Sequence, residues 1–207
     1  MALKAVITTD IVNSTLLTNK AQQQLKAALE ALLKPYAFEF YRGDSLQVYV
    51  EDAEQALLLL LQLRLLTQKL FQKDGLPVCD MRGSIGIGTV EFIDKKPGSS
   101  RGEAFTISGR GMDALGGKSD NRVSIISSNE LVNTGFELLA RFADYIIKRL
   151  TFKQAEVISE MLEGSTQNQA AVKLNKAEAT ISQHTKAAGW EQLSYLLAQY
   201  QVILKKI

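Results

Sequence analysis

The sequence is poor in residues on which many protein sites are built. Among 207 residues there is one cysteine, Cys79, one histidine, His184, and only 3 prolines. A single cysteine excludes an intramolecular disulfide framework and any structural zinc site built on cysteines. A single histidine argues against a histidine-rich metal site and against a Ser-His-Asp hydrolase. Any chemistry must therefore use carboxylates, arginine, lysine, hydroxyl groups or the backbone.

Charge of one sign and long apolar runs are also lacking. The sequence carries 24 Lys and Arg against 22 Asp and Glu, a net charge of +2 that excludes a strongly basic nucleic-acid coat protein. The most apolar stretch, residues 56–61, is far shorter than the ~20 residues of a membrane span. At the amino terminus the apolar run is too short for a signal peptide, and it reaches an acidic residue, Asp10, too early. We therefore expect a cytoplasmic protein with no membrane partner.

The first part of the chain alternates strand-like and helix-like patterns. Phe38 and Phe40, like Leu46 and Val48, alternate with other residues on either side of a glycine turn, as paired strands do. By the same reasoning we expect strands at 5–9, 37–41, 45–50, 78–87, 89–93 and 122–127, and helices at 21–33, 51–73 and 102–115. The order β-α-β-β-α-β-β-α-β is typical of an α+β fold around one sheet.

From Glu130 onward the pattern is helical throughout. We expect helices at 130–150, 152–163, 166–174, 176–187 and 190–206. This shift predicts an α+β domain over 1–128, a linker helix over 129–150 and an all-α domain over 151–207.

Two aspartates, Asp10 and Asp44, stand at the ends of expected strands. If these strands are neighbours, the two carboxylates converge, and with a backbone carbonyl, which we assign to Ile11, they offer hard oxygen ligands for Mg²⁺ carrying a triphosphate. Aspartate is also common in turns because it hydrogen-bonds its own backbone. Spacing alone leaves both interpretations open. A nearby glycine run, Gly83, Gly86 and Gly88, lies within an expected strand, which favours close backbone approach over a phosphate cradle.

Four motifs in order resemble those of the class III nucleotidyl cyclase homology domain. They are DIVNST at 10–15, RGDSLQ at 42–47, RGSIGIG at 82–88 and GEAFTISGR at 102–110. The resemblance covers roughly residues 5–127 and implies a ferredoxin-like sheet, with Mg²⁺ bound at Asp10 and Asp44 beside a nucleotide. With the helix-turn-helix described below, the architecture is similar to the SatD-type family of small bacterial proteins.

The resemblance carries over only part of a catalytic site. Arg110 matches the arginine that stabilises the transition-state phosphate, whereas Thr106 replaces the asparagine of active cyclases. Phe40 stands where adenylyl cyclases carry a base-selecting lysine. The incomplete set implies a degenerate sensor that binds nucleotide and Mg²⁺; the alternative is an active nucleoside-triphosphate-using enzyme of cyclase type. Because class III sites form between two subunits, the resemblance also implies a homodimer.

Residues 167–186 fit the pattern of a helix-turn-helix. Ala171 is the small residue needed where the two helices meet, Asn175 supplies the left-handed turn, and Ile181 returns to the core. In this geometry the second helix lies in the major groove of DNA, where Ser182 and Gln183 would read base edges.

The second helix supplies the remaining candidate contacts. Lys186 and the hydroxyls of Thr180 and Thr185 would meet phosphates, and Ala177, Glu178 and Ala179 complete the exposed set. Residues 150–207 contain six Lys against five Glu, a difference of only +1, so one unit would bind weakly and two in a dimer would gain avidity. These features predict a DNA-binding transcriptional regulator. The alternative is a helical dimerisation or docking protein that does not bind DNA.

Overall fold

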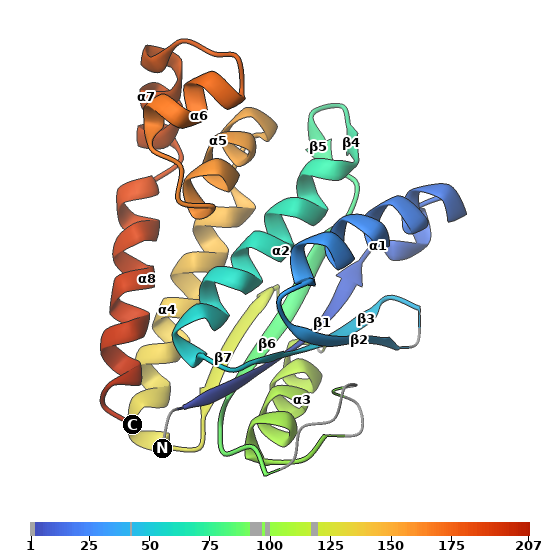
Figure 1. Cartoon of the computed structure of the whole chain (residues 1–207), viewed down its shortest axis with the longest axis vertical. Coiled ribbons are helices and arrows are strands. Elements are labelled where there is room, and N and C mark those ends of the chain that lie inside the picture. Colours follow the sequence, from blue (N-terminus) through green and yellow to red (C-terminus); the bar gives the residue numbers. More distant parts are fainter. Residues whose placement is uncertain (1–2, 42, 92–96, 98–99, 117–119) are drawn as a thin grey trace.

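A five-stranded sheet forms the centre of the molecule in the computed structural model (Figure 1), which describes residues 3–41, 43–91, 97, 100–116 and 120–207. The strand order is β2-β3-β1-β6-β7. Neighbouring strands are antiparallel except for β7, which runs parallel to β6. The strands are β1 (Lys4–Val12), β2 (Ala37–Tyr41), β3 (Ser45–Val50), β6 (Asp80–Gly88) and β7 (Val123–Ser127). The order of the first four is that of a ferredoxin-like β-α-β-β-α-β unit, so the predicted fold class is confirmed.

Helices cover both faces of this sheet. α1 (Asn19–Leu33) and α2 (Ala56–Leu70) lie on one face and α3 (Glu103–Leu115) lies on the other (Figure 1). The alternation of side chains along β6 shows this arrangement, because Gly83 faces Leu60 of α2 whereas Gly86 faces Ala104 of α3. Short 3₁₀ turns at Ser14–Leu16 and Ala53–Gln55 precede α1 and α2.

The sequence predicted one strand too many in the main sheet. Residues 89–91 form no strand, and residues 92–93 lie outside the described residues. A small hairpin, β4 (Gln72–Lys73) and β5 (Leu76–Pro77), instead follows α2 and turns at Asp74 and Gly75, both with positive φ. The expected helix over 51–73 therefore ends at Leu70.

The carboxy-terminal helices continue the core of the sheet domain. They are α4 (Glu130–Lys148), α5 (Phe152–Leu162), α6 (Gln167–Lys173), α7 (Glu178–Ala187) and α8 (Trp190–Leu204). α4 packs on β7, α5 packs on α2, and α8 lies beside α4 (Figure 1). One cluster of buried apolar residues runs from Ala5 to Leu204, and buried Tyr200 donates to the carbonyl of Ala53 at 2.9 Å.

The expected boundary between residues 128 and 150 therefore does not separate two cores. α4 is a single helix, and it packs on β7 and α8. The contact of α5 with α6 and α7 forms a separate small cluster, built on Val157, Ala170, Ala171 and Ile181. In the part of the chain that the structure describes, no helix combines the length and apolar character needed to cross a membrane.

Candidate functional site

The sheet brings the main chains of the two predicted metal-binding aspartates together. The β1–β3 register pairs Asp10 with Ser45, which follows Asp44. The amide of Ile11 donates to the carbonyl of Asp44 at 3.2 Å. The two strand ends are thus neighbours, as the sequence argument required.

The two carboxylates, however, take different partners. Asp10 accepts hydrogen bonds from Nε of Arg82 at 3.0 Å and from its Nη2. Arg82 also donates to the carbonyl of Leu115 at 3.2 Å, which places this ion pair on the α3 face of the sheet. The carboxylate of Asp44 accepts from the hydroxyl of Ser14 at 2.8 Å, beside α1. Hydrogen bonding to Asp10 raises the pKa of Arg82.

The donor set suits Mg²⁺ by its chemistry but is not arranged for it. Two carboxylates and a carbonyl are hard oxygen ligands. Asp10 is nevertheless neutralised by Arg82, and the described residues contain no cluster of three or more His, Cys, Asp or Glu able to hold a metal ion. The assignment of Asp10, Ile11 and Asp44 as ligands therefore stays a prediction.

A cleft of about 480 Å³ lies beside Asp44, between α1 and the β2–β3 hairpin. Its size falls within the range of small-molecule sites. Phe40, which the sequence comparison placed where adenylyl cyclases carry a base-selecting lysine, contributes apolar surface, and the ammonium of Lys26 lies 5.2 Å from its ring centroid. Ten more residues complete the lining: Ile11, Ser14, Leu17, Asn19, Gln22, Gln23, Leu25, Leu29, Gly43 and Asp44.

The predicted catalytic residues Thr106 and Arg110 do not reach this cleft. Both lie on α3 with exposed side chains, across the sheet from α1. Their catalytic roles stay predictions. The glycine run of β6 does allow close approach of α3, because a Cβ on Gly86 would lie 2.3 Å from the carbonyl oxygen of Ala104.

A buried ion network joins α2, β6 and α4, and the sequence analysis missed it. Arg64 is fully buried; its Nη2 donates to Asp80 and its Nη1 to Asp144, both at 2.8 Å. Asp144 also accepts from the amide of Arg122 at 3.0 Å and pairs with Lys148 at 3.1 Å. Burial lowers the pKa of Arg64, but the two aspartates outweigh this effect, so the net shift is upward. In the sequence, the signal of this network is Arg64 itself, a charged residue within a leucine-rich helix.

The α6–α7 segment has the local geometry of a helix-turn-helix. Asn175, between the helices, has φ +50°, and Ala171 and Ile181 are buried as predicted. Thr166 caps α6 in a capping box with Gln169. Lys176 occupies a position that is usually apolar, but its ammonium pairs with Glu156 of α5 at 2.9 Å, so an ion pair joins the turn between α6 and α7 to α5.

Most predicted DNA-facing residues lie on the open side of α7. Their side chains are exposed at Ala177, Glu178, Ser182, Gln183 and Lys186, and Thr180 is half-buried. Thr185 does not fit its predicted phosphate contact. It is 2% exposed and donates its hydroxyl to the carbonyl of Ser182 at 2.9 Å, because it follows buried Ile181 by one helical turn.

The comparisons with known proteins found similarity to solved structures, but not to any family model or curated sequence. No family model matches the chain, and no curated protein matches its sequence. Two structures of bacterial light-regulated adenylyl cyclases are similar to it with a TM-score of 0.41 each, at 14% and 15% sequence identity. Each similarity covers 60% of this chain, and it spans 43% of the first cyclase chain and 75% of the second.

Proposed function

We propose that the chain is a DNA-binding regulator in which α7 is the recognition helix. The observation that carries this proposal is the α6–Asn175–α7 turn, whose inner residues are buried while Ser182, Gln183 and Lys186 face outward. A helix presented in this way fits the major groove, where glutamine pairs with adenine. Figure 1 shows α6 and α7 at one end of the molecule, away from the sheet, so α7 is open to a duplex.

The charges around α7 predict weak binding that depends on a few contacts. Lys173 and Lys176 are paired with Glu160 and Glu156, whereas Lys186 takes part in no ion pair among the described residues. Each phosphate contact makes the plot of log affinity against log salt concentration steeper by about 0.9. Lys186 should therefore carry a measurable share of the salt dependence.

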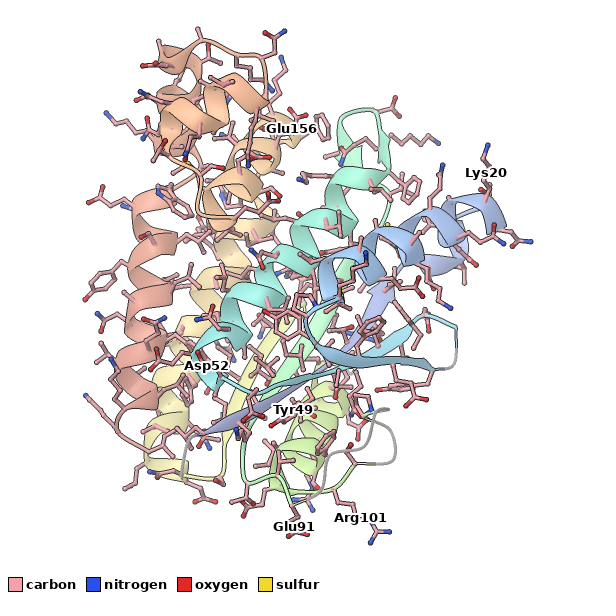
Figure 2. All side chains as sticks on the ribbon, in the orientation of Figure 1. Lys20, Tyr49, Asp52, Glu91, Arg101 and Glu156 are labelled. Atoms are coloured by element: carbon pink, nitrogen blue, oxygen red, sulfur yellow. The ribbon has the colours of Figure 1, made fainter. Side chains whose placement is uncertain are left out.

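Fluorescence anisotropy of labelled genomic duplexes, titrated at several salt concentrations, tests this proposal. Lys186→Ala should weaken binding and reduce the salt slope by about 1. The matched control is Lys20→Ala, because Figure 2 shows Lys20 at the far end of α1 and its side chain is exposed. Equal binding by Lys186→Ala and Lys20→Ala would count against α7 as the DNA-binding helix.

We also infer that the cleft beside Asp44 binds a nucleotide. A 480 Å³ cleft with polar and apolar lining, next to a carboxylate at a strand end, supports this second proposal. Asp44, which lines the cleft, and the carbonyl of Ile11 would hold the Mg²⁺ that accompanies the phosphates, whereas Asp10 would join them only by leaving Arg82 and the α3 face of the sheet. Since Thr106 and Arg110 lie across the sheet, the single chain supports binding rather than turnover.

A thermal-shift screen of ATP, GTP, CTP and UTP, each with and without Mg²⁺, tests the cleft. At least one nucleotide should raise the melting temperature, and Asp44→Asn should remove the part of the shift that requires Mg²⁺. Asp74→Asn is the matched control, because Asp74 is exposed in the β4–β5 turn and asparagine tolerates its positive φ. An Asp44→Asn shift equal to that of the parent would overturn the assignment.

A further inference from the structure

α4 and α8 present an apolar face that no described part of the chain covers. The two helices lie side by side on the outside of the molecule (Figure 1). They run in opposite directions, since Gly135 of α4 faces Ile203 of α8. Large side chains on this face are exposed by between 44% and 92% of their surface: Leu131, Leu138, Phe142, Tyr145, Tyr195 and Val202.

The exposed residues form a continuous surface rather than scattered positions. Leu131, Leu138 and Tyr145 recur every seven residues and Phe142 follows Leu138 by one turn, so all four lie on one side of α4. A hollow of about 570 Å³ between α4 and the start of α8 is lined in part by Phe142, Tyr145 and Tyr195. Contiguous apolar surface of this kind marks a contact site.

The sequence of α4 is complementary to itself when reversed. Leu138 is equally far from Leu131 and from Tyr145, so two antiparallel copies of α4 centred on Leu138 place Leu131 opposite Tyr145 and Leu138 opposite itself, while Phe142 lies opposite Thr134. The charged flank has nearly the same symmetry. Under this axis Glu137 falls opposite position 139 of the other helix, two residues from Arg141, so the ion pair that these residues form within one helix can also be formed between the two helices.

The available area is sufficient for a specific contact. α4 has 19 residues and is therefore about 28 Å long. With α8 packed beside it at an interaxial distance of roughly 8–10 Å, the two helices together are about 18 Å wide, so the face measures about 500 Å² on each partner. Two such faces bury about 1,000 Å², the minimum expected of a specific protein interface.

We propose that the α4/α8 face joins two copies of this chain in a twofold dimer, with the α4 helices antiparallel across Leu138. The two α7 helices then lie at opposite ends of the assembly, because the α5–α7 unit follows the carboxy-terminal end of α4. This dimer does not depend on either function proposed above. The experiments that test it therefore measure only the oligomeric state of the chain.

Sedimentation velocity over a range of concentrations gives the first test. The parent chain should dimerise, and Leu138→Glu should weaken dimerisation more than about tenfold, because the twofold axis sets two like charges against each other. The matched control is Leu76→Glu, at a residue 70% exposed on the β4–β5 hairpin, and it should dimerise like the parent. Circular dichroism should show both variants folded, since both side chains are exposed.

Charge complementation gives the second test. Glu137→Arg and Arg141→Glu should each dimerise less than the parent, because each places like charges across the axis. An equimolar mixture of the two variants should form a heterodimer, in which the two arginines of one chain meet the two glutamates of the other. A monomeric parent at about 100 μM, a protein concentration well above the Kd of typical specific complexes, would overturn the proposal. Full dimerisation of Leu138→Glu, or a mixture no more associated than its components, would also overturn it.

Discussion

Replacement of Asp144 by alanine should destabilise the fold far more than removal of an exposed ion pair on the same helix. Asp144 is buried; its carboxylate accepts hydrogen bonds from Arg64 and from the amide of Arg122, and it forms an ion pair with Lys148. Its loss leaves the guanidinium of Arg64 buried with Asp80 as its remaining carboxylate. Breaking a buried pair in this way costs about 3–5 kcal/mol. Since domains are stable by ~5–15 kcal/mol, the loss is a large fraction of the total.

Urea unfolding followed by circular dichroism gives the free energies. Glu137→Ala is the control, because Glu137 pairs with Arg141 four residues later and both are exposed; since both also flank the proposed dimer face, unfolding is measured at a protein concentration at which the chain is monomeric. Its expected cost is about 0.5 kcal/mol. In thermal unfolding, Asp144→Ala should lower Tm by about 6–20 °C, taking roughly 2–4 °C per kcal/mol for a chain of this size.

A double variant separates the buried charge from loss of packing volume. Arg64→Met with Asp144→Leu replaces the pair by apolar side chains, and should cost less than the sum of the two single changes by ~1 kcal/mol or more. An Asp144→Ala variant that loses no more stability than Glu137→Ala would refute the reasoning.

Three further outcomes follow from particular contacts. Gly86→Ala should destabilise the fold by about 1–3 kcal/mol, because its Cβ would overlap the carbonyl of Ala104. Gly109→Ala, which has open space around it, should stabilise α3 by ~0.5–1 kcal/mol. Urea unfolding measures both changes. Burial raises the pKa of Cys79 to about 11, so iodoacetamide at pH 8 should leave it unmodified in the native chain and alkylate it in urea, as mass spectrometry would show. Burial lowers the pKa of Lys69 from its ordinary 10.5, so unfolding takes up a proton at this group, and the free energy of unfolding of the parent relative to that of Lys69→Met should rise with pH just below 10.5. Parallel pH profiles for the two chains would contradict this.

The local features of the fold were largely predictable because each rests on neighbouring residues. The β2–β3 hairpin has the predicted bounds, since alternation and a turn glycine specify it. The left-handed turn at Asn175 follows from a residue type that tolerates that conformation. The burial of Thr185 carried an equally local signal, the one-turn spacing from Ile181, and the sequence analysis overlooked it.

Long-range partners could not be predicted in the same way. Nothing near Asp10 in the sequence indicates that Arg82 takes its carboxylate, because that contact depends on the β1–β6 register. The helix expected at 190–206 was assigned to a separate all-α domain, whereas Tyr200 of α8 packs on the sheet domain. The Arg64 network likewise depends on residues 16 and 80 positions away.

Selection of DNA sites from a random duplex library by the full chain tests the central claim most directly, because it asks whether α7 reads bases. The parent should enrich a defined motif containing A·T pairs. Gln183→Ala should lose the preference at an adenine while retaining the rest, since glutamine pairs with that base in the major groove. Failure of the parent to enrich any motif, or an unchanged motif with Gln183→Ala, would contradict the assignment of α7 as a recognition helix.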